Sequence, residues 1–156
     1  MSEAATGGCQ CGAVRFRVGR FGNASICHCR MCQKQFGSFF GPLVTAHDLV
    51  WTRGAPKQFA SSDKARRGFC AACGTPLTYE ALGYPPTIAI GALDNPAAAA
   101  PVVQVNPTDK LAFFDGLCSL PTEPVGGDPV SEAFNVSLTS FQHPDHDTSE
   151  WPPKGR

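Results

Sequence analysis

Cys70-Ala71-Ala72-Cys73-Gly74 is the stretch that decides the fold. Two cysteines separated by two residues and followed by a glycine form a tight turn that aims both sulfurs at one point. Cys9-Gln10-Cys11, flanked by glycines on both sides, is a second short pair far away in the sequence. Together the two pairs can supply the four thiolates of a closed tetrahedral zinc site. The sequence therefore predicts a metal clamp that joins the first strand to the middle of the chain.

Cys27-His28-Cys29-Arg30-Met31-Cys32 is a cysteine cluster of a different kind. Three sulfurs fall within this short stretch, and no fourth cysteine lies nearby in the sequence. On a strand, Cys27 and Cys29 share one face, and a following turn can bring Cys32 round to meet them. Three thiolates leave one coordination position of a zinc ion open, which is typical of catalytic sites. We therefore predict a second, open zinc site here.

Two alternatives for these cysteines stay open. Cys118 or His28 could complete a second closed structural site, or the three cysteines could combine with the other four in a different pairing. Cys9, Cys11, Cys70 and Cys73 could also be reduced cysteines that only pack. His28 lies between two strand ligands and should point to the opposite face, so we interpret it as a supporting residue. Cys118 is isolated in the sequence, and we place it outside the metal sites.

Basic residues lie close to the cysteine clusters in the sequence. Seven thiolates with two divalent ions would carry three net negative charges, which these cations could partly offset while also receiving a carboxylate-bearing substrate. The alternative is that they are ordinary solvated surface charges. The residues concerned are Arg30, Lys34, Arg66 and Arg67.

Composition favours one domain that is rich in turns. Of the 156 residues, 42% are hydrophobic. The 16 glycines and 14 prolines together make up about 19% of the chain, which exceeds the roughly 12% of average usage. A net charge of zero gives no basic face for nucleic acid. The sequence contains no apolar run of roughly 18 residues and no leader pattern, so we expect a cytoplasmic protein without a membrane partner. Because the cytosol is reducing, the cysteines are expected to bind metal rather than to form disulfide bonds.

The hydrophobic pattern predicts short strands. Val14, Phe16 and Val18 alternate with Arg15 and Arg17, which is the period of a half-buried strand over residues 13–18. Residues 19–22 should then turn the chain, and residues 30–36 should form a short helix. Further strands are expected over residues 25–29, 38–45, 58–61, 77–82, 87–93, 102–106 and 111–114. The prediction is a single mainly β domain over residues 1–141 and a mobile polar tail over residues 142–156.

Three stretches of this chain, taken together, match the motifs of one known family. They are Gly8-Cys9-Gln10-Cys11-Gly12, residues 27–34 followed by Gly37-Ser38, and Arg67-Gly68-Phe69-Cys70 through Leu77. Residues 91–94 and 114–117 with Pro121 extend the match to about residues 7–121. The chain resembles the glutathione-dependent formaldehyde-activating enzyme family. The resemblance implies an Mss4-like fold of short antiparallel strands, with one zinc on Cys9, Cys11, Cys70 and Cys73 and a second on Cys27, Cys29 and Cys32.

The resemblance also implies an activity. The family's named reaction joins formaldehyde to glutathione, gives S-hydroxymethylglutathione, and is classed as carbon-sulfur lyase chemistry, with the zinc on Cys27, Cys29 and Cys32 as the reacting centre. The chain departs from the family pattern at Gln104, where members commonly carry histidine, and at Phe113 or Phe114, where tryptophan is frequent. Two competing hypotheses are a non-catalytic zinc-stabilised binding module of the same fold, and a redox protein with Cys118 as nucleophile, similar to methionine sulfoxide reductases. The sequence carries no signal for an oligomeric state.

Overall fold

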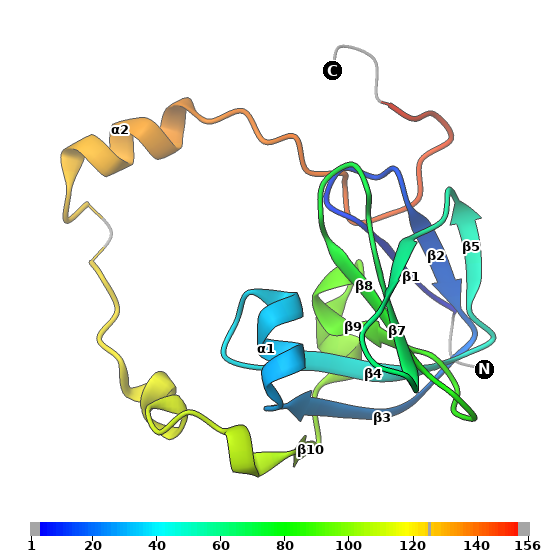
Figure 1. The fold of residues 1–156 in the computed structure, drawn as a ribbon. Helices are drawn as coiled ribbons and strands as arrows, with labels where there is room; N and C mark the ends of the chain where they lie inside the picture. The colour runs from blue at the N-terminus through cyan, green and yellow to red at the C-terminus, as the bar shows by residue number, and fades with distance from the viewer. Residues whose placement is uncertain (1–3, 125, 153–156) are drawn as a thin grey trace.

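Two β-sheets form the body of the protein in the computed structural model, which describes residues 4–124 and 126–152 (Figure 1). The smaller sheet is antiparallel and contains β1 (Ala5–Gly8), β2 (Arg15–Val18) and β5 (Val50–Arg53). The larger sheet contains, in spatial order, β10 (Val103–Val105), β3 (Arg20–Cys27), β4 (Gly41–His47), β9 (Thr87–Ala89), β8 (Pro76–Ala81), β7 (Ala65–Phe69) and β6 (Lys57–Ala60). The prediction of a mainly β fold is confirmed. One strand pair, β10 with β3, is parallel.

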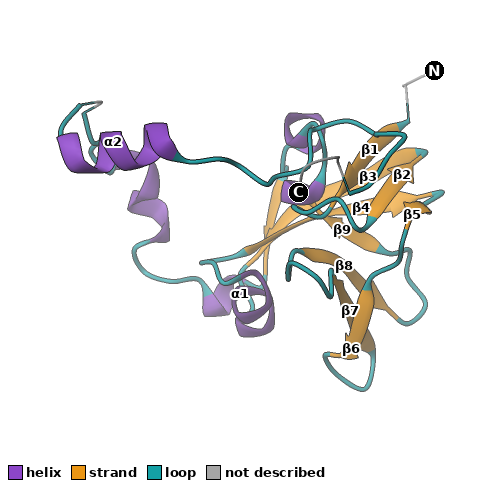
Figure 2. Cartoon of the chain, turned by 90° about the horizontal axis from the view of Figure 1, so that it is seen from above, coloured by secondary structure: helices purple, strands orange, loops and turns teal. Residues whose placement is uncertain are grey.

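Helices are few and short. The helix α1 (Arg30–Phe36) follows β3 directly, with Cys29 as its N-cap and Gly37 in the left-handed conformation at its C-cap. The helix α2 (Pro129–Ser137) begins after Asp128, whose carboxylate accepts hydrogen bonds from the backbone N–H groups of the first turn. Figure 2 shows that α2 lies well away from both sheets. Short 3-10 helices cover Ile90–Ala92, Pro96–Ala99, Pro107–Asp109 and Phe114–Ser119.

The hydrophobic core joins the two sheets. Phe16 from β2, Leu77 from β8 and Ile88 from β9 belong to one cluster of buried side chains, and all three are fully enclosed. Each such side chain contributes roughly 1.5–3 kcal/mol relative to an exposed one. The ring of Phe16 packs edge-on against Trp51 of β5 at 5.8 Å between centroids. Cys9 and Cys70 belong to the same cluster, so the four-cysteine set lies at the margin of the core.

Most predicted elements exist, but three are wrong in whole or in part. The strand expected over residues 87–93 ends at Ala89, where the 3-10 helix Ile90–Ala92 begins. Residues 19–22 do not turn the chain, because β3 begins at Arg20 and the chain only changes sheets at Gly19, whose N–H donates to the carbonyl of His47. Residues 111–114 are not a strand but a turn, closed by a hydrogen bond from Phe114 N to Leu111 O at 2.9 Å, that enters a 3-10 helix. The strands β1, β5 and β7 and the helix α2 lie outside the predicted elements.

Arg15 is buried, although its alternation with Val14 and Phe16 placed it on the face opposite the core. Only 3% of its surface is exposed. Its guanidinium donates to both carboxylate oxygens of Asp94 at 2.8 and 2.6 Å, and to Asp147 Oδ1 at 2.9 and 2.8 Å. Asp147 belongs to residues 142–152, the C-terminal segment, which lies on this face. On this face of β2 the C-terminal segment, 132 residues away in sequence, therefore covers Arg15, whereas Arg17 stays exposed.

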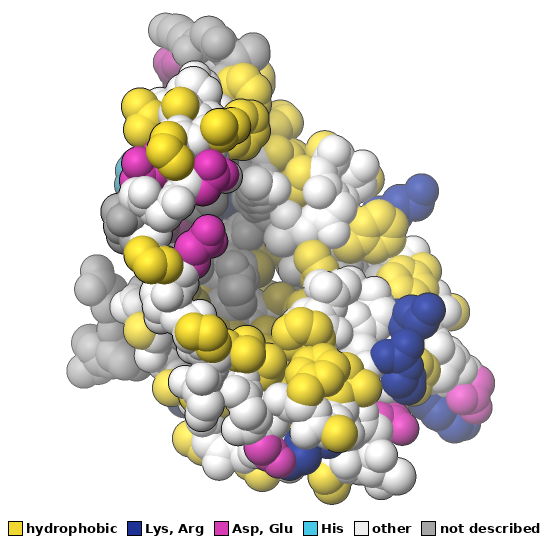
Figure 3. Space-filling model, turned by 90° about the vertical axis from the view of Figure 1, so that its left-hand side faces the viewer, with side chains coloured by type: hydrophobic (Ala, Val, Ile, Leu, Met, Phe, Trp, Pro, Cys, Tyr) yellow, Lys and Arg dark blue, Asp and Glu magenta, His cyan; other side chains and the backbone are white. Residues whose placement is uncertain are grey.

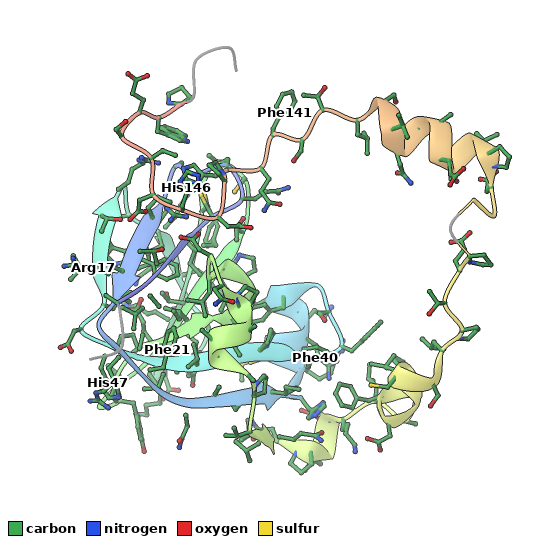
Figure 4. All side chains as sticks on the ribbon, turned by 180° about the vertical axis from the view of Figure 1, so that it is seen from behind. Arg17, Phe21, Phe40, His47, Phe141 and His146 are labelled. Atoms are coloured by element: carbon green, nitrogen blue, oxygen red, sulfur yellow. The ribbon has the colours of Figure 1, made fainter. Side chains whose placement is uncertain are left out.

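A long arm, residues 120–124 and 126–141, leads from the larger sheet to the C-terminal segment and carries α2 (Figure 1). Val130, Phe134 and Leu138 of the arm are more than half exposed. Seen from the side of the arm, hydrophobic side chains are visible along it (Figure 3), and Phe141 lies between α2 and the C-terminal segment that carries His146 (Figure 4).

The domain boundary at residue 141 and the mobility of residues 142–156 stay predictions. Residues 1–3 and 125 of the predicted domain and residues 153–156 of the predicted tail lie outside the part of the chain that the structure describes. Within the described part, no helix has the length and apolar character that crossing a membrane requires.

Removing the charge of Asp94 should destabilise the protein strongly. The change Asp94→Asn leaves the buried Arg15 guanidinium with only the half-exposed Asp147 as counter-charge, and breaking a buried pair in this way costs about 3–5 kcal/mol. The matched change Asp147→Asn removes an exposed partner and should cost about 1 kcal/mol or less. Urea unfolding of both variants measures the difference, and equal losses would contradict the assignment of Asp94 as the main partner.

Candidate metal centres

Two turns of similar geometry present the first cysteine set. Cys9 and Cys11 follow β1, and Cys70 and Cys73 lie between β7 and β8. In each turn a glycine with positive φ, +79° at Gly12 and +78° at Gly74, donates its N–H to the carbonyl of the first cysteine at 3.0 and 2.8 Å. That backbone conformation favours glycine, which explains why a glycine follows each cysteine pair.

The four sulfurs of these turns converge on one point. All four Sγ atoms lie within 4.8 Å of one another. Cys9 Sγ is 3.6 Å from Cys11 Sγ, and Cys11 Sγ is 3.9 Å from Cys70 Sγ. These separations far exceed the roughly 2.05 Å of a disulfide bond. They match the edge of about 3.8 Å in a tetrahedron with zinc–sulfur bonds of about 2.3 Å. A set of four thiolates in this arrangement fits zinc.

Hydrogen bonds to the sulfurs oppose the effect of burial in this set. Burial raises the pKa of Cys9, Cys11 and Cys70 above the ordinary value. Burial also acts on Cys73, but hydrogen bonds from the hydroxyl and backbone of Thr75 outweigh it and lower the pKa of Cys73 to about 6. The N–H of Val14 donates to Cys9 Sγ at 3.3 Å. Since cysteine binds metal as the thiolate, these donors favour the binding form.

The C-terminal segment covers the first of the two turns. Trp151 Nε1 donates to the carbonyl of Cys11 at 2.7 Å, and the N–H of His143 donates to the carbonyl of Gln10 at 2.7 Å. A Cβ placed on Gly12 would lie 2.2 Å from the His143 ring, so that ring occupies the space beside the glycine. A small cavity of about 120 Å³, lined among others by Cys9 and His143, remains between the segment and the turn.

The second cysteine set is formed by the end of β3 and the start of α1. Cys27 is the last residue of β3, Cys29 is the N-cap of α1 and Cys32 lies in its first turn. Their three Sγ atoms lie within 4.8 Å of one another, and no further ligand atom from the described chain joins the group. Cys29 Sγ accepts a hydrogen bond from the N–H of Cys32 at 3.4 Å, as a helix N-cap does. Three thiolates fit zinc and leave one position of a tetrahedral ion without a protein ligand.

Two side chains donate hydrogen bonds to the second set. Asn106 Nδ2 lies 3.2 Å from Cys27 Sγ, and Arg67 Nη2 lies 3.4 Å from Cys32 Sγ. A hydrogen bond from Cys32 lowers the pKa of Cys27 to about 5, and the same bond raises the pKa of Cys32. Because metal binds cysteine as the thiolate, an ion held by both sulfurs would displace the protons they carry.

His28 and Cys118 do not join the second set. The His28 ring is fully buried, bonded through Nε2 to Gln104 Oε1 at 2.9 Å and stacked edge-on against Phe114 at 4.6 Å. Its role as a supporting residue matches the expectation that it points away from the ligand face. Gln104 serves as its partner. Cys118 is exposed in the 3-10 helix Phe114–Ser119 and belongs to neither cysteine set.

Of the four cations named from the sequence, three line one shallow pocket. Arg30, Lys34 and Arg67 line a pocket of about 420 Å³ between α1 and β6, and no acidic residue is among its lining residues. Arg66 points to the other side of β7 and lines a different pocket. The sequence did not predict Asn106 as a residue of the site, because an asparagine after a strand indicates only a turn. Its left-handed backbone, with φ +53°, is what turns its amide toward Cys27.

Comparison with known proteins identifies a matching family and a solved structure of similar fold. The model of a family described as glutathione-dependent formaldehyde-activating enzyme matches residues 4–108. A structural-genomics protein of Rhodobacter sphaeroides, known from its crystal structure, is similar in fold with a TM-score of 0.50 and 24% sequence identity. The match covers 64% of this chain and 99% of that chain. At this identity it bears on the fold alone.

Replacing Cys70 should remove one metal ion per chain and much of the stability. In Cys70→Ser the four-thiolate set loses a ligand, and structural zinc sites contribute on the order of 10 kcal/mol. The measurement is zinc content by elemental analysis together with thermal unfolding. Cys118→Ser is the matched control and should leave both readouts unchanged, because Cys118 is exposed and outside both sets. A Cys70→Ser protein with unchanged zinc content and unchanged stability would contradict the clamp.

Proposed function

Since the chain belongs to the glutathione-dependent formaldehyde-activating enzyme family, we propose that it is a zinc-dependent enzyme of the carbon-sulfur lyase type. The reaction joins formaldehyde to the thiol of glutathione, and S-hydroxymethylglutathione is the product. Zinc is the cofactor at both cysteine sets. The first set, Cys9, Cys11, Cys70 and Cys73, is structural, and the second set, Cys27, Cys29 and Cys32, is catalytic.

The observation that carries this proposal is the incomplete ligand number of the second set. Three sulfurs lie within 4.8 Å of one another, with no fourth ligand from the described chain. The first set has four sulfurs and is closed. Structural zinc sites have four protein ligands, whereas catalytic sites have three and accept water or substrate at the fourth position. The same chain thus carries one set of each kind.

The reaction needs an activated sulfur and no redox partner. A zinc ion with an open position supplies a lowered pKa for a bound thiol and polarises a carbonyl oxygen. A carbon–sulfur bond forms between the glutathione sulfur and the formaldehyde carbon, the carbonyl π bond breaks, and the carbonyl oxygen takes up the proton that the thiol releases. No group leaves, and no atom changes its oxidation state.

The protein's own residues position the sulfurs and the substrate. Asn106 and Arg67 donate to Cys27 and Cys32, and these hydrogen bonds stabilise the thiolate form of both ligands. Glutathione carries carboxylates, and the pocket lined by Arg30, Lys34 and Arg67 offers cations without an acidic side chain in its lining. Arg67 also contacts Cys32 of the second set, so these cations support a carboxylate-bearing thiol as the substrate class.

A second candidate function is a zinc-stabilised binding module without turnover. It is favoured by the burial of two of the three sulfur ligands, because Cys27 is only 7% exposed and Cys32 only 3%. Access to the second set then depends on the partly exposed Cys29. For the enzyme we expect action in the cytoplasm, with a small thiol rather than nucleic acid or a membrane as its partner.

The change Cys29→Ser tests the catalytic role of the second set. We expect the variant to keep the metal of the first set, to lose the second metal, and to lose nearly all acceleration of adduct formation, because Cys29 is the accessible ligand. The measurement combines zinc content with the rate of S-hydroxymethylglutathione formation, followed by NMR after glutathione and formaldehyde are mixed. Cys118→Ser is the control.

Two results would decide against the proposal. Full activity and full metal content in Cys29→Ser would show that the second set is not the reacting centre. The binding module would be favoured if the wild-type protein holds two zinc ions but the adduct forms no faster with the protein than without it.

A further inference from the structure

Arg67 is a fully buried cation at the centre of β7. Only 2% of its surface is exposed. It pairs across the sheet with Phe59 of β6 on one side and Tyr79 of β8 on the other. Removing a guanidinium from water costs several kcal/mol unless an opposite charge and hydrogen-bond acceptors replace the lost hydration. Burial of this side chain is therefore stable only if an anion lies next to it.

The contacts of Arg67 include no carboxylate. Nε donates to Ser61 Oγ at 2.8 Å, Nη1 donates to Gln35 Oε1, and the guanidinium lies 4.8 Å from the centre of the Tyr79 ring. Across residues 4–124 and 126–152, no aspartate or glutamate forms an ion pair with it. Hydroxyl, amide and aromatic ring are neutral. The remaining contact, from Nη2 to Cys32 Sγ at 3.4 Å, is with the one group that can be an anion.

Arg15 provides an internal comparison. It is buried to nearly the same extent, at 3% exposed, and it has two carboxylate partners, Asp94 and Asp147. The fold therefore balances its other deeply buried arginine with acidic residues. At Arg67 the place of those acids is taken by a sulfur atom.

We propose that Arg67 is the counter-ion of the metal-loaded second cysteine set, paired with it through the contact between its guanidinium and Cys32 Sγ. Three thiolates with one divalent ion carry one net negative charge, and the guanidinium supplies one positive charge, so the buried group as a whole is neutral. The inference rests on the proposed function in one respect, namely that the second set binds a divalent metal ion. Arg67 is a positioning residue, since it acts on the metal through a ligand.

The shape of the guanidinium matters as well as its charge. Arg67 connects β7 to Cys32 and Gln35, which lie three residues apart on one face of α1. It also holds Ser61. A lysine at this position would keep the charge but would offer a single point donor in place of the planar fork. We therefore expect the charge to determine whether the second metal binds, and the fork to determine how tightly.

The test measures metal binding by the full chain rather than activity. Zinc or cobalt is titrated against a chromophoric chelator, which gives the stoichiometry and the affinity of each set, and the cobalt–thiolate absorption reports the number of sulfur ligands. In Arg67→Gln we expect the first metal to bind as in the wild type and the affinity for the second to fall roughly 10- to 100-fold. Arg67→Lys should recover most of that loss. Arg66→Gln, an exposed neighbour on the same strand, is the control.

A double-mutant cycle keeps the proposal testable if the glutamine variant folds poorly. Cys32→Ser leaves the guanidinium buried without an anion, so adding Arg67→Met to it should restore part of the lost stability, whereas Arg67→Met alone should destabilise. Equal destabilisation by Arg67→Met in both backgrounds would overturn the counter-ion role. So would wild-type affinity for the second metal in Arg67→Gln. A wild-type protein that binds only one metal would instead overturn the proposed function.

Discussion

The contact between the turn at Cys9 and Cys11 and the turn at Cys70 and Cys73 is the constraint on which the rest of the structure depends. The strands of the smaller sheet are only four residues long and bury few side chains of their own. Their position over the larger sheet is fixed where four sulfurs, contributed by turns 59 residues apart in sequence, meet at the margin of the core. Closing a loop of that length costs chain entropy, and a metal ion shared by the two turns would offset that cost.

Local patterns in the sequence predicted those parts of the fold that local physics determines. The alternation of Val14, Phe16 and Val18 identified a buried strand face, and the helix over residues 30–36 has the predicted bounds. The cysteine spacings predicted both sets, because a turn of two or three residues can aim its sulfurs without help from the rest of the chain. In the structure the seven cysteines form one group of four and one of three, and their roles as metal ligands stay predictions.

Long-range contacts explain what the sequence did not predict. Arg15 alternates with core residues, and this pattern predicts that it faces solvent. In the structure the C-terminal segment, 132 residues later in the sequence, covers it. In the sequence Arg67 is one of several cations near a cysteine pair. Only the packing of α1 against β7 in the structure distinguishes it from the exposed Arg66. The strand β7 escaped prediction for a related reason, since Arg66 and Arg67 interrupt its hydrophobic pattern. The turn expected at residues 19–22 failed because a single glycine suffices to carry the chain between sheets.

The attachment of the C-terminal segment has a consequence for the order of events during synthesis. Arg15 leaves the ribosome 132 residues before Asp147, its partner in that segment. At translation speeds of about 5–20 residues per second, that difference corresponds to roughly 7–26 s. The turn at Cys9 and Cys11 is without its cover throughout that interval, and Cys70 and Cys73 emerge before it ends. A nascent chain can therefore bring its four sulfurs together while the turn is still open to an incoming ion, and the C-terminal segment, which is made later, covers the turn afterwards.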